Sequence, residues 1–160
     1  MYRILADKLI EQTDKVVVLL GATQVGKTTL LKRLFPDSVL INLEKSNYIE
    51  IFNSRDLKKI KEAVAAESGL PVKVLILDEI QRLDDPGLVA KLLHDEVPEW
   101  RLIISGSSAL EIAQKASESL AGRKRSLRLY PLTLKEELVQ QGRWELRESD
   151  PRLINFNPIS

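Results

Sequence analysis

The sequence contains no cysteine and only one histidine, which excludes several kinds of site at the outset. Without thiolates there can be no disulfide framework, no zinc site built on cysteine, no iron–sulfur cluster and no cysteine nucleophile. A single histidine also argues against a metal site built from imidazoles. The absence of cysteine fits a reducing compartment.

Long apolar runs are also absent. The longest, residues 16–20 and 74–77, fall far short of the roughly 20 residues that a membrane-spanning helix needs. Near the N-terminus, Asp7, Lys8 and Glu11 interrupt the apolar residues, unlike the continuous apolar stretch of a secretory signal. We therefore expect a cytoplasmic protein with no membrane partner.

The chain also lacks an excess of either charge. Its 24 Lys and Arg residues against 23 Asp and Glu residues give a formal net charge of +1, unlike a histone-type nucleic-acid binder. Any basic surface must be local. The length, 160 residues, has room for about one domain around one core.

Apolar periodicity predicts strands that alternate with helices. The predicted strands are residues 16–20, 39–43, 72–77, 102–105 and 126–129, and apolar residues at helical spacing lie between them. Asp85 and Pro86 are typical of a helix start, and capping-box spacing at Ser108 and Thr133 predicts two further helices. Because parallel strands need crossover connections, this order predicts an α/β fold with an open parallel sheet and helices on both faces.

A glycine-rich loop follows the first predicted strand and precedes a helix. It matches the G-x-x-x-x-G-K-[ST] pattern, or Walker A motif, in which backbone N–H groups cradle phosphates. Lys27 is then expected to reach the β- and γ-phosphates, Thr28 to bind Mg²⁺, and Thr29 to contact the α-phosphate. The plainer alternative is a glycine turn that only joins strand and helix. The predicted nucleotide-binding residues are Gly21, Ala22, Thr23, Gln24, Val25, Gly26, Lys27, Thr28 and Thr29.

A carboxylate pair ends the third predicted strand, as in a Walker B motif. Four apolar residues lead to Asp78 and Glu79, and the carboxyl ends of parallel strands line the ligand crevice. Asp78 is expected to hold Mg²⁺, and Glu79 to activate the attacking water. We expect the two side chains to diverge because successive strand positions point to opposite faces. Glu44, after the second predicted strand, is a minor rival for the catalytic acid.

Two further features follow the fourth predicted strand. A hydroxyl there can bridge the γ-phosphate and the lytic water, with Ser107 the first choice and Ser105 the second; alternatively, these serines cap the next helix. Arg123 lies in a basic segment and is a candidate arginine finger for a neighbouring subunit's nucleotide. The alternatives for Arg123 are a solvated basic loop or a patch facing a nucleic-acid backbone.

Together these motifs resemble the AAA+ ATPases. The segments that carry the resemblance are, in order, GATQVGKTTLLKRL, INLE, LILDEIQRL, LIISGSSALEI and SLAGRKRSLRLYPLTLKEEL. The resemblance implies a P-loop NTPase fold with a sheet ordered 5-1-4-3-2, and ATP with Mg²⁺ as ligands. It also implies Walker B roles for Asp78 and Glu79, a sensor hydroxyl near Ser107, and Arg123 as the finger.

The sequence departs from this family in two places. Thr23 stands where the family commonly has arginine, and too few residues follow residue 142 for the helical lid that normally closes the pocket. We therefore expect a nucleotide-binding core at residues 1–142 and an irregular tail at 143–160, a core without its lid.

The leading hypothesis is Mg²⁺-dependent hydrolysis of ATP to ADP and phosphate, with a second copy or a partner protein completing the site. The first alternative is a nucleotide-binding switch with little or no hydrolysis. A small-molecule kinase is disfavoured because adjacent acids suit water as the acceptor. Nucleic-acid binding is motivated only by the basic segment around Arg123.

Overall fold

The protein is built on a five-stranded sheet in which every strand pairing is parallel. The computed structural model describes residues 5–11, 14–22, 24–69, 71–107 and 119–130. The strands are β1 (Val16–Leu20), β2 (Val39–Asn42), β3 (Val74–Asp78), β4 (Arg101–Gly106) and β5 (Lys124–Arg128). Their order across the sheet is β2-β3-β4-β1-β5, which confirms the predicted order read from the other side.

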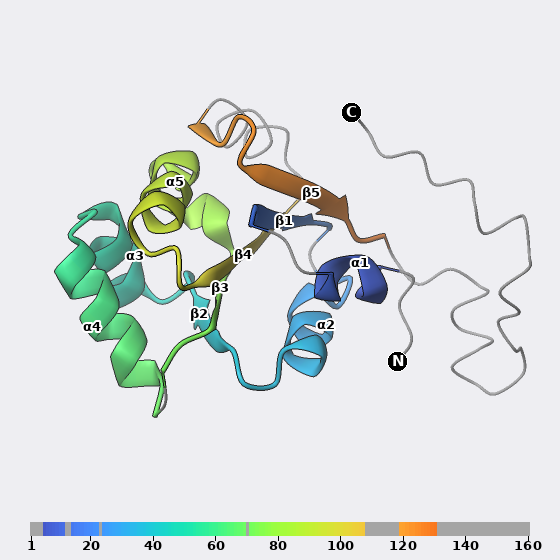
Figure 1. Ribbon diagram of the computed structural model, residues 1–160, viewed down its shortest axis with the longest axis horizontal. Coiled ribbons are helices and arrows are strands. Elements are labelled where there is room, and N and C mark those ends of the chain that lie inside the picture. Colours follow the sequence, from blue (N-terminus) through green and yellow to red (C-terminus); the bar gives the residue numbers. More distant parts are fainter. Residues whose placement is uncertain (1–4, 12–13, 23, 70, 108–118, 131–160) are drawn as a thin grey trace, which may run out of the picture.

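Helices cover both faces of this sheet. Helices α1 (Ala6–Ile10) and α2 (Lys27–Leu34) lie on one side, and α3 (Ser46–Asn53), α4 (Leu57–Glu67) and α5 (Pro86–Glu96) lie on the other (Figure 1). A short 3₁₀ helix, η1 (Ile80–Arg82), follows β3 after a single residue, Glu79. In the part of the chain that the structure describes, no helix has both the length and the apolar character needed to cross a lipid bilayer.

The central strands supply the core because their alternate residues point to opposite faces. In β1, Val16, Val18 and Leu20 pack with α3, α4 and α5, whereas Val17 and Leu19 pack with α1 and α2. All five residues of β1 are buried. This burial on both faces explains why β1 reads as an unbroken apolar run in the sequence.

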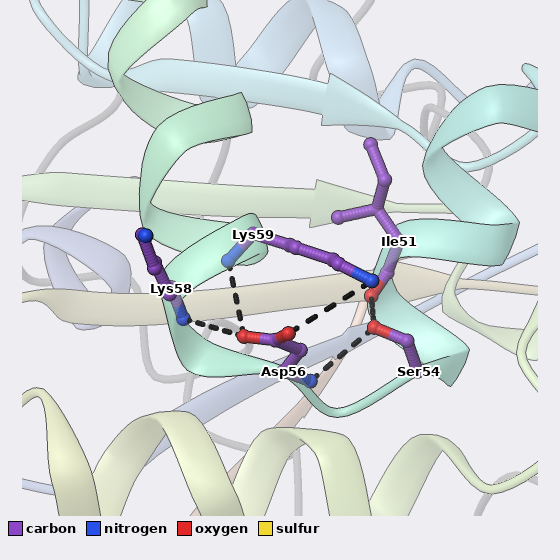
Figure 2. Close-up of polar contacts among 5 residues, drawn as sticks. All are labelled: Ile51, Ser54, Asp56, Lys58 and Lys59. Carbon is purple, nitrogen blue, oxygen red and sulfur yellow. Dashed lines mark hydrogen bonds and ion pairs between the residues drawn. The ribbon is translucent and has the colours of Figure 1, made fainter.

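Helix α3 was not predicted, and a tight corner joins it to α4. The helix has only eight residues, rich in Ser, Asn and aromatic side chains that are weak helix formers, and is held by burial of Tyr48 and Phe52. At the corner, Asp56 accepts hydrogen bonds from the backbone N–H groups of Lys58 and Lys59, as an N-cap does (Figure 2).

The strand register brings the functional segments to one edge of the sheet. Leu20 pairs with Gly106 and Arg128, Leu77 pairs with Ile104, and Asn42 pairs with Asp78, so all five strands end within one residue of the same level. We call this level the carboxyl edge and the opposite one, where Val16 pairs with Lys124, the amino edge. The glycine-rich loop, residues 21–26, begins at the carboxyl edge.

Some expectations fall outside the described residues. These are the helices predicted to begin at Ser108 and Thr133, the placement of Thr23, and the boundary at residue 142 with its tail. Among the described elements, Asp85 caps α5 through the N–H of Leu88, with Pro86 in the first turn, as predicted.

Candidate functional site

The glycine-rich loop leaves β1 by a close passage past β5. A Cβ atom on Gly21 would lie 2.6 Å from the carbonyl oxygen of Leu129, so only glycine fits here without a shift of the backbone. At the other end of the loop, Gly26 has a φ of 88°, in the left-handed region that glycine adopts without strain. Both glycines of the motif are therefore required by backbone geometry.

Lys27, in the first turn of α2, is 5% exposed, and its ammonium group binds the loop itself. Its Nζ donates to the carbonyl oxygens of Gly21, at 2.9 Å, and Ala22, at 3.0 Å. The charge is therefore held at the mouth of the loop by neutral acceptors. A phosphate is a stronger acceptor for an ammonium group than a carbonyl is, so these contacts are exchangeable for an anionic ligand.

Asp78 joins three elements at the carboxyl edge. The carboxylate is 3% exposed and accepts from Thr28 Oγ1 of α2 at 2.6 Å and from Ser105 Oγ of β4 at 2.5 Å. The backbone N–H of Glu79 donates to the same carboxylate at 3.1 Å. The structure thus brings together Thr28 and Asp78, the two predicted metal ligands, and places Ser105 beside them.

Glu79 departs from the strand, which corrects one expectation. Its side chain was expected to diverge from that of Asp78 because strand residues alternate, but β3 ends at Asp78. Glu79 itself has φ 58° and ψ 44°, a left-handed conformation that is strained for a residue other than glycine. The turn, not strand alternation, sets the direction of Glu79.

Two polar residues at this edge were not predicted as site residues from the sequence. Gln81, in η1, donates a hydrogen bond from Nε2 to the Glu79 carboxylate. Asn42, opposite Asp78 in the register, accepts from the backbone N–H of Glu44 at 2.8 Å. Both lie in segments that carry the family resemblance, INLE and LILDEIQRL, but neither was assigned a role there: the position of Asn42 opposite Asp78 depends on the strand pairing, and the contact of Gln81 depends on the turn at Glu79.

Glu44, the rival catalytic acid, is exposed and lies on the loop after β2. Its carboxylate pairs with Arg82 of η1 at 3.7 Å, and both side chains are 55% exposed. An exposed carboxylate paired with an arginine is a solvated surface group rather than a prepared base. The geometry therefore favours Glu79, which is partly buried beside Asp78.

Ser107 and Arg123 lie at opposite edges of the sheet. Ser107 is partly buried and directly follows the end of β4, at the carboxyl edge. Arg123 precedes β5 at the amino edge, where its Nε binds Asp95 of α5 at 3.1 Å. The sheet, about five residues deep at roughly 3.3 Å per residue, separates Arg123 from the glycine-rich loop of its own chain.

The donor set at the carboxyl edge fits a magnesium nucleotide. One hydroxyl and one carboxylate, already 2.6 Å apart, are the oxygen ligands that Mg²⁺ takes from a protein when phosphates and waters complete its shell. No cluster of three or more His, Cys, Asp or Glu side chains occurs among the described residues. Sites that hold Mg²⁺ together with a phosphate ligand do not need one.

Comparisons with known proteins identify the family. A family model described as an AAA domain matches residues 13–138. An uncharacterized protein of Mycobacterium tuberculosis is 33% identical over 122 residues, covering 76% of this chain and 26% of the relative. The replication factor C large subunit of Sulfolobus acidocaldarius is 36% identical over 90 residues, 52% of this chain and 20% of that subunit.

Among solved structures, the Pif1 helicase of Candida albicans aligns with a TM-score of 0.47 at 16% identity, over 86% of this chain and 41% of the helicase. The matched region spans 26% and 20% of the lengths of the two curated relatives above. The family model, in contrast, covers the sheet, the glycine-rich loop and Asp78 together. The chain belongs to the AAA domain family.

Proposed function

We propose that the protein binds ATP with Mg²⁺ and hydrolyses it to ADP and phosphate. The observation that carries the proposal is the hydrogen bond of 2.6 Å between Thr28 and Asp78. It joins the first turn of α2 to the end of β3, so the Walker A and Walker B segments already meet where a metal would bridge them to a triphosphate.

Each side chain at the carboxyl edge then has a distinct task. Lys27 exchanges its carbonyl partners for β- and γ-phosphate oxygens, and Thr28 and Asp78 hold the metal. Bound Mg²⁺ would neutralise developing charge on the phosphates. Ser105 fixes the Asp78 carboxylate from β4, whereas Ser107 remains our first choice for contacting the γ-phosphate.

Glu79 is the proposed general base. It accepts the proton of the attacking water as the oxygen of that water bonds to the γ-phosphorus and the bond to the ADP oxygen breaks. Its strained backbone supports this role, because strain of this kind gathers at sites where a side chain must be aimed. Family membership supports the chemistry as well.

Phosphate release by the full chain and by Glu79→Gln tests this assignment. We expect ATP- and Mg²⁺-dependent release by the wild type and a loss of about 10²-fold or more in kcat for the variant, as for removal of a general base. Glu44→Gln is the matched control, because it changes the rival carboxylate at the same edge, and should retain the wild-type rate. Equal turnover by the wild type and Glu79→Gln would refute the base.

Thermal stabilisation by ATP, ADP and GTP, with and without Mg²⁺, reports binding independently of turnover. Stabilisation by ATP with no phosphate release by the wild type would identify a nucleotide-binding switch instead. No stabilisation by any nucleotide would refute the proposal as a whole.

A second copy is proposed to complete the site through Arg123. The residue lies at the amino edge and cannot reach the nucleotide of its own chain, so it can act only on a neighbour's. We expect specific activity to rise with protein concentration, and Arg123→Ala to abolish that rise while ATP still stabilises the protein. Arg128→Ala, an exposed arginine at the end of β5, is the control.

A further inference from the structure

A hydrogen bond joins Glu79 to a residue that the proposed reaction does not use. Gln81 donates from its amide nitrogen, Nε2, to Oε2 of Glu79. An ionised carboxylate can only accept hydrogen bonds, so the amide nitrogen must face it. This fixes the orientation of the amide and turns its carbonyl oxygen away from Glu79.

That carbonyl oxygen is buried without a partner. Gln81 Oε1 has no hydrogen-bond donor among the residues that the structure describes, although the side chain as a whole is only partly buried. A buried acceptor with no donor is destabilising, whereas an apolar side chain of similar shape would carry no such cost. The stability of the fold therefore does not account for glutamine at position 81.

The backbone conformation of Glu79 makes the contact possible. Residues two apart do not face each other along a helix. Here Glu79 adopts the left-handed conformation and Gln81 lies in the short 3₁₀ turn that follows, so their side chains meet. The strained φ of Glu79 and the unpaired side-chain carbonyl of Gln81 are both locally unfavourable. Both accompany the same contact, in which Gln81 holds one oxygen of the Glu79 carboxylate.

We propose that Gln81 is a positioning residue for Glu79. By holding Oε2, the amide fixes the plane of the carboxylate and leaves Oε1 to accept the proton of the attacking water. This inference rests on the proposed hydrolysis of ATP, because it assigns Gln81 a task only in that reaction. Gln81 acts through Glu79 and touches neither the water nor the phosphates.

Turnover and stability of Gln81→Leu test the proposal. Leucine has a similar volume and neither donates nor accepts, so we expect kcat to fall about tenfold or more with a nearly unchanged KM for ATP. The Tm of the ligand-free protein should stay the same or rise, because the orphaned acceptor is removed. Gln81→Glu, which keeps the shape but loses the donor, should lower kcat similarly.

The double variants Glu79→Gln/Gln81→Leu and Glu44→Gln/Gln81→Leu give the sharpest readout. If Gln81 acts only through Glu79, its substitution changes nothing further once the base is gone, but retains its full effect beside Glu44→Gln. A residue that merely supported the fold would lower the rate in both backgrounds.

Several results would overturn the proposal. One is a Gln81→Leu variant whose kcat equals or exceeds that of the wild type; another is a loss of rate that persists on the Glu79→Gln background. A fall in Tm together with kcat in both Gln81 variants would make the residue structural. Each of these, with an active wild type, leaves the ATPase proposal standing, whereas a wild type that releases no phosphate removes both.

Discussion

Two cations, the buried Lys27 and the partly buried Arg101, bind main-chain carbonyls at opposite edges of the sheet. At the carboxyl edge, Lys27 donates to Gly21 and Ala22 of the glycine-rich loop. At the amino edge, Arg101 donates to the carbonyl oxygens that end α1: Leu9, Ile10 at 3.2 Å and Glu11 at 2.9 Å. Because both cations bind main-chain carbonyls, any difference in how firmly each one is held must come from the cations themselves and from their other contacts.

Arg101 is fixed on several sides. Its guanidinium lies 5.1 Å from the centre of the Phe35 ring, and burial, with a smaller contribution from Arg125, lowers the pKa of Arg101 below its ordinary value. A rigid fork that spans a helix end and stacks on a ring cannot turn toward a ligand. Lys27, in contrast, is a point charge on a flexible stem whose carbonyl partners a phosphate can replace. The cation at the carboxyl edge can therefore exchange its carbonyl partners for a ligand, whereas the cation at the amino edge is held in place by its surroundings.

The largest expected effect is the loss of nucleotide binding in Lys27→Ala. We expect kcat/KM for ATP to fall by about 10²-fold or more, and stabilisation by ATP to disappear, because the phosphates lose their cation. The unfolding free energy without ligand should fall by less than in Arg101→Met, because the two lost hydrogen bonds are offset by removal of a cation that is costly to bury. Lys32→Ala, an exposed lysine of the same helix, is the control. If ATP stabilised Lys27→Ala as strongly as it stabilises the wild type, Lys27 would not be the cation that binds the phosphates, and the proposed difference between the two edges would be wrong.

Arg101→Met should show the reverse pattern. The variant keeps an apolar stem against Phe35 but loses the charged hydrogen bonds to the end of α1, so we expect a loss of about 2 kcal/mol of unfolding free energy. Urea denaturation measures this, and ATP binding, measured separately, should be retained. Arg128→Met, at an exposed position, should cost little. A variant that is stable but fails to bind ATP would show that the amino edge is not purely structural.

Gly21→Ala tests whether the carboxyl edge also carries a fixed element. The new Cβ would lie 2.6 Å from the carbonyl oxygen of Leu129, which is backbone and cannot rotate away. We expect a destabilisation of about 1–3 kcal/mol, as for overpacking, and weaker ATP binding as the loop shifts. Gly69→Ala is the matched control, because nothing lies within 4 Å of its Cβ position. Equal stability of the two variants would contradict the close passage.

The sequence predicts the segments whose chemistry is local. The glycine-rich loop with Lys27 and Thr28 lies within eight consecutive residues, and Asp78 ends an apolar run, so both are visible without the fold. The strand alternation and the crossover rule then predict that they share an edge. The hydrogen bond between Thr28 and Asp78 agrees with that prediction.

What the sequence does not predict depends on register and on backbone conformation. Asn42 comes opposite Asp78 only because β2 pairs with β3 in one particular register. Gln81 meets Glu79 only because Glu79 is left-handed, which no propensity favours for glutamate. The serine that contacts Asp78 is Ser105, the second choice, because it lies within β4 at a level where Asp78 can be reached.

The smallest expected effect concerns a permanent contact away from both cations. Tyr48 of α3 donates a hydrogen bond to Glu67 at the end of α4, and this bond, with burial and the charge of Glu67, raises the pKa of Tyr48 above its ordinary value of 10.0. The unfolded chain therefore ionises at Tyr48 first as the pH rises. The stabilising contribution is complete below pH 10.0 and is lost as the pH rises through the folded value.

Tyr48→Phe removes this dependence and sharpens the contrast with Lys27. At neutral pH we expect a cost of about 0.5–1 kcal/mol, because one hydrogen bond is lost while the ring stays packed. Above pH 10.0 the stability of the wild type should fall toward that of the variant, and urea denaturation across that range follows the difference. ATP stabilisation at neutral pH should be equal in both proteins, since this contact exchanges with no ligand. A difference in stability that stays constant with pH would show that the hydroxyl contributes through packing and not through its proton.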